Sequence, residues 1–131
     1  MISISRRNIR KFLTISVSGD NIIVRESSSK DLKEALYSLV SIIPMGKVVT
    51  YKMLAKLLNT HPRVIAKFLA SNDKPIIIPC HRVIMSNGSL GGYSFGGPGI
   101  KKKLLELEGI RINDHKVPSK YIWDIVNYLT T

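Results

Sequence analysis

Hydrophobic and polar positions alternate along residues 12–25, on either side of Gly19-Asp20-Asn21. Alternation with a period of two is typical of half-buried strands, and a short polar segment with glycine between two such runs favours a tight turn. The pattern therefore predicts a small β-hairpin near the N-terminus.

After the hairpin, apolar residues recur at helical spacing until Pro44-Met45-Gly46. Asp31, with Glu34 three residues further on, fits a capping box, so we expect a helix to begin at Asp31 and to end before Pro44. Its apolar stripe should face a core and consists of Leu32, Ala35, Leu36, Leu39, Val40 and Ile43.

Two shorter helices are predicted next. Thr50 is expected to cap the first of them, and residues 59–62 should turn the chain into the second, which predicts a helix-turn-helix. Arg63 and Lys67 lie one turn apart on an outer side of the second helix, and this pattern fits a solvated face as well as a DNA contact. The residues expected to point inward are Leu54, Leu57, Leu58, Ile65, Phe68 and Leu69.

The C-terminal part contains a glycine-rich segment, residues 91–99, which lacks the Gly-Lys-Ser/Thr of a phosphate-binding loop. It is either a binding loop or a flexible connection. A helix is expected over residues 100–108 with Gly109 as its C-cap, and Ser119 should cap a last helix. The apolar side of that last helix would be formed by Ile122, Ile125, Val126 and Leu129.

These elements indicate the fold class α/β (α+β). We expect a mainly helical C-terminal domain with a helix-turn-helix motif, residues 29–131, preceded by a reduced N-terminal β-hairpin region, residues 1–28.

Charge changes the picture further, because 20 Lys and Arg stand against 9 Asp and Glu in 131 residues, a net charge of +11. Such an excess favours a polyanionic partner, either nucleic acid or an anionic membrane surface. Basic residues are dense around the expected helix-turn-helix, which suits phosphate neutralisation, whereas a long amphipathic face for a membrane is missing from the pattern. They are Lys47, Lys52, Lys56, Arg63, Lys67, Lys74 and Arg82, with Asp73 as the acidic residue among them.

No apolar run approaches the roughly 18 residues of a spanning helix, and the opening Met-Ile-Ser-Ile-Ser-Arg-Arg lacks the order of a secretory signal. We therefore expect a cytoplasmic protein without a membrane partner. The chain has one cysteine, which can form neither an internal disulfide nor a multi-cysteine zinc site, so no structural metal is expected.

That cysteine, Cys80, lies in the run Pro79-Cys80-His81-Arg82-Val83. Although a lone cysteine is more often a buried apolar residue, it can act as a nucleophile if a base or positive charge lowers its pKa from about 8.5. Adjacent side chains of an extended segment point to opposite faces, so His81 could assist only through a turn or a bridging water, and otherwise it is a surface imidazole. Glu108 or Glu106 could orient the imidazole, and the pattern does not choose between them.

In this order, these residues resemble the O6-alkylguanine-DNA alkyltransferases, also called methylated-DNA–protein-cysteine methyltransferases. The resemblance runs from Ile43-Pro44-Met45-Gly46-Lys47-Val48-Val49-Thr50-Tyr51 through Pro79-Cys80-His81-Arg82-Val83 and Gly91-Gly92-Tyr93-Ser94 to the segment from Lys101 to Leu107-Glu108-Gly109. It implies DNA repair by direct damage reversal, in which an alkyl group moves irreversibly and once from O6-alkylguanine to the protein. It also implies a monomer without a cofactor that acts on double-stranded DNA, and it leaves O4-alkylthymine open as a second substrate.

The resemblance also implies roles for single residues. Cys80 would accept the alkyl group, His81 would act as its base through a water, and Glu108 would orient His81. Tyr51 would contact the lesion and turn the phosphate, and Arg63 would replace the extruded base in the stack. The remaining DNA or substrate contacts would be Asn72, which braces the active-site turn, Arg82, and the pocket residues Val83, Tyr93 and Ser94.

Four features depart from the family pattern: a shorter N-terminal region, a shorter turn between the two helices, Ala66-Lys67-Phe68 where small residues are usual, and an inserted Phe95. We expect Phe95 to change the size of alkyl group that the pocket admits. Two other functions stay open. One is a helix-turn-helix protein that binds lesions or regulates transcription without transfer, and the other is a thiol hydrolase with a Cys-His-Glu arrangement.

Overall fold

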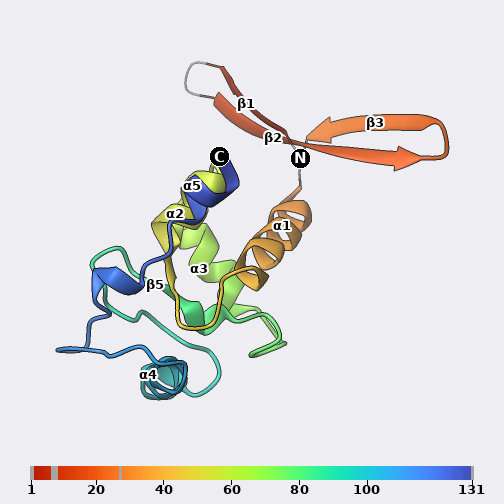
Figure 1. Ribbon diagram of the computed structural model, residues 1–131. Coiled ribbons are helices and arrows are strands. Elements are labelled where there is room, and N and C mark those ends of the chain that lie inside the picture. Colours follow the sequence, from red (N-terminus) through yellow and green to blue (C-terminus); the bar gives the residue numbers. More distant parts are fainter. Residues whose placement is uncertain (1, 7–8, 27, 131) are drawn as a thin grey trace.

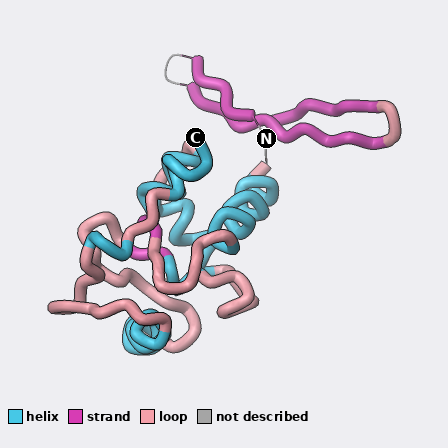
Figure 2. Tube along the Cα trace, in the orientation of Figure 1, coloured by secondary structure: helices cyan, strands magenta, loops and turns pink. Residues whose placement is uncertain are grey.

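The computed structural model describes residues 2–6, 9–26 and 28–130 and arranges them as a three-stranded sheet followed by a helical body (Figures 1 and 2). Figure 1 shows the sheet beyond the start of the first helix, apart from the other helices. The strands of this sheet are β1 (Ile2–Arg6), β2 (Ile9–Ser18) and β3 (Asn21–Glu26). The body contains α1 (Ser29–Ser41), β4 (Val49–Thr50), α2 (Tyr51–Leu58), α3 (Pro62–Ala70), β5 (Val83–Ile84), α4 (Gly97–Leu107) and α5 (Ile125–Thr130), with 3-10 turns at Cys80–Arg82 and Ser119–Tyr121.

The sheet is antiparallel in the order β1-β2-β3 and confirms the predicted hairpin. Ser18 pairs with Asn21 across a turn in which Gly19 has a φ of 58°, a left-handed conformation that glycine adopts without strain. Strand β1, which the sequence pattern did not predict, pairs with β2 along its whole length.

Helix α1 begins earlier than predicted, and the capping residue is different. The hydroxyl of Ser28 accepts a hydrogen bond from Asp31 N, while the Asp31 carboxylate accepts from Ser28 N at 2.7 Å. The expectation of Asp31 as N-cap with Glu34 as its partner was therefore wrong. Ser28 takes the cap because its backbone is extended and Asp31 lies three residues on, where its carboxylate reaches back.

Helices α2 and α3 form the expected helix-turn-helix. Thr50 caps α2, with its hydroxyl accepting from Met53 N at 3.1 Å, as predicted. Three residues, 59–61, then turn the chain into α3. Phe68 is half-buried against the core, so of the two larger residues after Ala66 only Lys67 lies on the exposed side of α3. The buried residues of the two helices are Leu54, Ala55, Leu58, Ile65 and Leu69.

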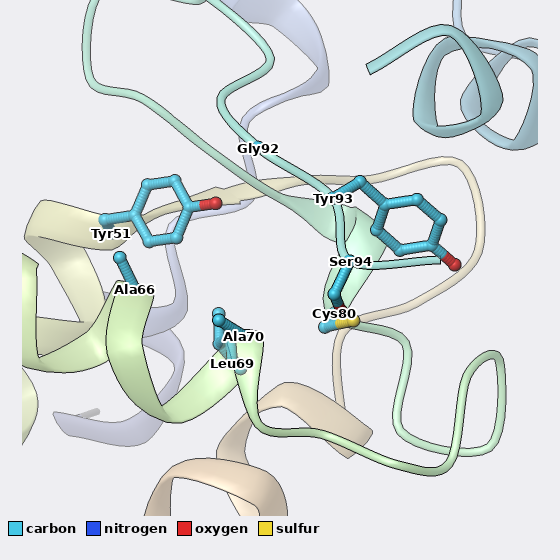
Figure 3. A pocket seen from close by; sticks show the side chains of 8 residues that line it. All are labelled: Tyr51, Ala66, Leu69, Ala70, Cys80, Gly92, Tyr93 and Ser94. Atoms are coloured by element: carbon cyan, nitrogen blue, oxygen red, sulfur yellow. The ribbon is translucent and has the colours of Figure 1, made fainter. Parts of the chain in front are cut away.

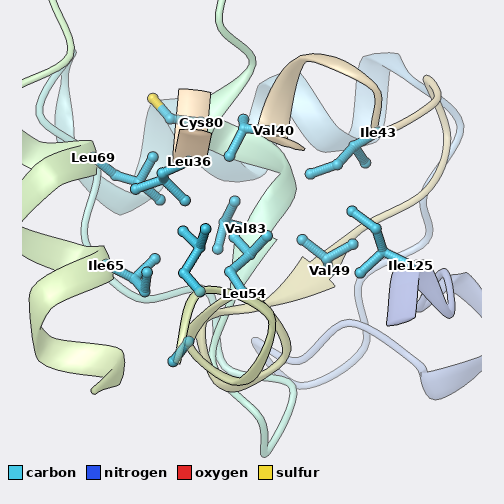
Figure 4. Packing of buried hydrophobic residues seen from close by; sticks show 12 residues of the cluster. Leu36, Val40, Ile43, Val49, Leu54, Ile65, Leu69, Cys80, Val83 and Ile125 are labelled. Carbon is cyan, nitrogen blue, oxygen red and sulfur yellow. The ribbon is translucent and has the colours of Figure 1, made fainter. Parts of the chain in front are cut away.

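The main core joins α1, α2, α3, the β4–β5 pair and α5 (Figure 4). Val49 of β4 pairs with Val83 of β5, so the segment directly after Cys80 is anchored in this core. Figure 4 shows Cys80 at the edge of the cluster with its sulfur pointing away from the aliphatic side chains. A second cluster lies between α4 and the C-terminal loops and contains Val48, Ile84, Leu90, Leu105, Ile110 and Val117.

The last helix begins later than expected. Ser119 starts a 3-10 turn without capping a helix through its side chain, and Trp123 N donates to Val48 O at 2.7 Å. Val48 N also donates to Tyr121 O at 3.0 Å, so the chain cannot continue from the 3-10 turn into an α-helix here, and the prediction of a helix from Ser119 was wrong. Asp124 accepts from Asn127 N at 3.0 Å, at the start of α5. No helix among the described residues is long and apolar enough to cross a membrane.

Candidate active site

A cavity of about 300 Å³ opens beside Cys80, between the helix-turn-helix and the glycine-rich segment. Figure 3 shows Tyr51 and Cys80 at opposite ends of this cavity, which we call the reaction cavity. Its other lining residues are Ala66, Leu69 and Ala70 of α3 and Gly92, Tyr93 and Ser94 of the loop. The glycine-rich segment is therefore the wall of a cavity rather than a plain connection.

The Cys80 thiol is held by a tight turn that Asn72 braces. Cys80 N donates to Ile78 O at 2.7 Å, and Asn72 Nδ2 donates both to that same carbonyl at 3.1 Å and to Cys80 Sγ at 3.4 Å. Lys74 N in turn donates to Asn72 Oδ1 at 3.0 Å, which fixes the amide. A donor aimed at the sulfur favours its charged form, so Asn72 is placed to stabilise a thiolate.

Behind Cys80, the side chains of His81 and Arg82 converge on Glu108. His81 Nε2 lies 3.0 Å from Glu108 Oε2, while Arg82 Nε and Nη2 donate to the two carboxylate oxygens at 2.9 and 2.7 Å. Arg82 also donates to Ile43 O at 2.8 Å. Partial burial acts to raise the pKa of Glu108, but the hydrogen bonds from Arg82 and His81 outweigh it and hold this pKa below its usual value, so the carboxylate is ionised.

His81 is 1% exposed, and this burial lowers its pKa below 6.5 even though the Glu108 carboxylate acts to raise it. The imidazole is therefore neutral at pH 7. An ionised carboxylate can only accept, so the single ring proton lies on Nε2 and Nδ1 keeps a free lone pair. Nδ1 has no hydrogen-bond partner among the described residues, which leaves it available as a base.

Lys101 of α4 lies fully buried under the loop. Its Nζ donates to Val83 O at 2.6 Å, to Gly92 O at 3.2 Å and to the Tyr51 hydroxyl at 3.4 Å. Burial lowers the pKa of Lys101 to about 8, against the opposing effect of a negative charge on Cys80. The Lys101 amine thus connects β5, the glycine-rich loop and Tyr51.

A second cavity of about 350 Å³ shares Tyr51, Ala66 and Gly92 with the reaction cavity. Arg63 lies on its wall and is exposed at the start of α3. Burial, together with the proximity of Cys80, raises the pKa of Tyr51 to about 12, so its hydroxyl keeps its proton at neutral pH.

Comparison with known proteins matches residues 31–110 to the family model of the 6-O-methylguanine DNA methyltransferase DNA-binding domain. The chain belongs to this methyltransferase family. A methylated-DNA–protein-cysteine methyltransferase of Pyrobaculum aerophilum is 50% identical over 82 residues, 63% of this chain and 53% of that protein. One of Methanopyrus kandleri is 46% identical over 107 residues, 82% of this chain and 79% of that protein. The chain thus spans about half the length of the first relative and more of the second.

Solved structures of similar proteins agree with the fold of this methyltransferase family member. S. pombe Atl1 in complex with damaged DNA containing O6-carboxymethylguanine superposes with a TM-score of 0.67 at 25% identity, over 74% of this chain and 98% of that one. The O6-methylguanine-DNA methyltransferase of Pyrococcus kodakaraensis gives a TM-score of 0.55 at 42% identity, over 60% of this chain and 46% of that one.

The structure brings most of the site residues named from the sequence to one place. Cys80, Tyr51, Tyr93 and Ser94 line the reaction cavity, and Asn72, His81 and Glu108 lie behind the thiol. Arg82 and Val83 line neither cavity: Arg82 bonds to Glu108 and Ile43, and Val83 is buried with its carbonyl on Lys101. The catalytic and binding roles expected from the sequence, for these two residues and for the others, stay predictions.

The sequence pattern did not indicate Lys101 as a site residue. One signal could have found it, because Lys101 precedes the buried Leu105 by four residues and so occupies the inner face of α4. A lysine at such a position is rare unless it has internal partners.

Proposed function

We propose that this chain repairs DNA by direct reversal of damage, moving an alkyl group irreversibly from O6 of guanine to Cys80 Sγ. The observation that carries the proposal is the thiol on the wall of the reaction cavity, with a neutral imidazole held by a carboxylate behind it. The cavity volume of about 300 Å³ lies at the lower end of the range of small-ligand pockets, about 300–1,000 Å³.

The chemistry follows from the geometry. His81 takes the thiol proton at Nδ1 through a water, and Glu108 stabilises the imidazolium that forms. The thiolate attacks the alkyl carbon, so that a sulfur–carbon bond forms while the carbon–O6 bond breaks and its electron pair goes to the purine. The purine anion takes up one proton, which balances the thiol proton that the His81 imidazolium releases through water, and the sulfur is left as a thioether. Reuse of Cys80 would need this stable bond to be cleaved, so each molecule acts once.

Tyr51 suits the leaving group. Its hydroxyl stays protonated, because burial raises its pKa to about 12, and it lies at the end of the cavity opposite Cys80 (Figure 3). In this position it can donate a hydrogen bond to the purine as negative charge develops there.

Delivery of the lesion requires the nucleotide to leave the duplex, at a cost of a few kcal/mol. Arg63 on α3 would fill the gap in the stack, with its planar guanidinium against the neighbouring bases. We further propose that the protein works in the cytoplasm, since a reactive thiol requires a reducing compartment.

Intact mass spectrometry tests the proposal. After incubation with a duplex that contains O6-methylguanine, the protein should gain one methyl group, mapped to Cys80, and Cys80→Ala should gain none. Tight lesion binding without any mass gain would instead support the non-transferring helix-turn-helix alternative. Repeated turnover on an ester would support a thiol hydrolase.

A further inference from the structure

Helix α3 begins with an unusual capping residue. His61 has an extended backbone, and its Nδ1 accepts a hydrogen bond from Arg63 N at 3.1 Å. Helix N-caps favour Ser, Thr, Asp and Asn, because their side-chain oxygens accept from the first free N–H groups whatever the pH near neutrality. A histidine can do so only while its ring is neutral and its proton lies on Nε2.

The first turn of α3 depends on this one residue. Pro62 brings no N–H, the Arg63 N–H ends on the His61 ring, and Val64 N donates to His61 O at 2.9 Å. Arg63 is therefore the second residue of a helical turn whose N–H groups bond to His61. The direction in which Arg63 leaves the helix follows from that turn.

We propose that His61 is a positioning residue for Arg63 and that it makes base extrusion depend on pH. The inference rests on the proposed function, in which Arg63 takes the place of the extruded base. Protonation of Nδ1 would turn the acceptor into a donor that faces the Arg63 N–H. It would also place a positive charge at a helix N-terminus, where cations are unfavourable. The Arg63 N–H then loses its acceptor, while Val64 N and Ile65 N keep theirs on His61 O. The start of α3 is weakened at the residue that has to enter the stack.

The charged groups around this turn are cationic. Arg63 follows on the same helix, Lys52 of α2 borders the same cavity as Pro62 and Arg63, and Lys56 lies in the last turn of α2. No described acidic residue forms an ion pair with His61. A protonated His61 would therefore draw DNA phosphates closer and strengthen binding while weakening extrusion. The opposite signs of the two effects separate them in an experiment.

The experiment measures both steps with the full chain. Anisotropy of a dye-labelled duplex reports binding, and rapid-mixing fluorescence of a 2-aminopurine beside O6-methylguanine reports loss of stacking. Wild type is compared with His61→Asn, which keeps an acceptor that does not titrate, and with His61→Ala, which has none. His115→Asn is the matched control, because His115 is also exposed but lies in a turn at residues 113–116, outside the helix-turn-helix.

At about pH 8, His61→Asn should extrude as wild type does, and His61→Ala should extrude about fivefold less, which is the usual loss for a missing cap. When the pH is lowered from about 8 to about 5.5, wild type and His115→Asn should lose extrusion while His61→Asn stays higher by about fivefold.

Equal pH profiles for wild type and His61→Asn would overturn the proposal, and so would full extrusion by His61→Ala. If binding tightens at low pH in wild type and His115→Asn but not in His61→Asn, with no change in extrusion, His61 is a phosphate contact and not a positioning residue. Failure of the proposed function looks different, since wild type would then neither extrude the base nor gain a methyl group at any pH.

Discussion

Replacing Glu108 by glutamine tests the base of the proposed transfer most directly. Glu108 accepts three hydrogen bonds on two oxygens, one from His81 Nε2 and two from Arg82. Glutamine offers one oxygen and one NH2 group. If the NH2 takes the place of Oε2, it faces His81 Nε2 and favours the tautomer with the proton on Nδ1, which removes the base. If it takes the place of Oε1, it faces the Arg82 Nε–H, and two donors collide.

Two magnitudes follow for Glu108→Gln. Loss of a correctly oriented base should slow transfer by about 100-fold, at the lower end of what general bases contribute. Arg82 and Glu108 are each 11% exposed, so neutralising the carboxylate leaves a mostly buried guanidinium without its partner and should cost about 3 kcal/mol of stability.

The pH dependence of the transfer rate of Glu108→Gln should also shift in a definite direction. Transfer requires neutral His81, so the wild-type rate falls as pH drops through the His81 pKa, which burial holds below 6.5. The Glu108 carboxylate acts to raise that pKa. Its removal should therefore move the acidic limb to lower pH while the plateau rate falls.

Single-turnover transfer from an O6-methylguanine duplex measures the rate, and urea unfolding followed by circular dichroism measures stability. Glu106→Gln is the matched control, since Glu106 is exposed on the same helix and forms none of the described contacts to His81. A plateau rate within threefold of wild type, or an acidic limb that moves to higher pH, would refute the reasoning about the base.

Three further outcomes are expected. Asn72→Ala removes the donor to Cys80 Sγ and Ile78 O. The single-turnover rate should fall about tenfold, and the free energy of unfolding in urea should fall by about 2 kcal/mol. Unchanged values would mean that this hydrogen-bond donor is dispensable. The Phe95 ring packs edge-on against the Tyr93 ring, with 5.7 Å between the ring centroids. Phe95→Ala should loosen the Tyr93 wall of the reaction cavity and raise the transfer rate from O6-benzylguanine relative to that from O6-methylguanine. A constant ratio of the two rates would contradict this. Burial lowers the pKa of Lys101 from 10.5 to about 8, so the folded state binds fewer protons than the unfolded state in that window and gains stability as pH rises through it. The unfolding free energy of wild type minus that of Lys101→Met should grow by about 3 kcal/mol over this range. A constant difference would contradict the lowered pKa of Lys101.

The sequence predicted the helix-turn-helix well because its signals are local. Thr50 lies directly before an apolar-periodic segment, and the turn at residues 59–61 follows it within one helix length. Capping was less predictable where two candidates compete. Ser28 and Asp31 can both cap a helix, and only the extended backbone at Ser28 decides between them.

The site itself was less accessible to pattern reasoning. An extended segment at Cys80 would have sent His81 to the opposite face, but the segment is a 3-10 turn that buries the imidazole against a helix 27 residues further on. Spacing alone could not choose Glu108 over Glu106, and the resemblance was needed. The last helix was misjudged for a similar reason, because residues 121–123 follow the non-local partner Val48 rather than their own helical period.

The reaction site lies where the two hydrophobic clusters meet, and this explains why its polar contacts bear on folding and chemistry together. Cys80 and Val83 belong to the cluster with α1 and α2, while Leu105, just before Glu108, belongs to the other. Arg82 spans them, with one hydrogen bond to the carbonyl of Ile43 and two to Glu108. Because Glu108 is the C-cap residue of α4, this ion pair also anchors the end of that helix. The same pair fixes the carboxylate that sets the His81 tautomer. Substitutions at this junction should therefore lower stability and rate together, whereas those at His61 should change base extrusion and DNA binding in opposite directions.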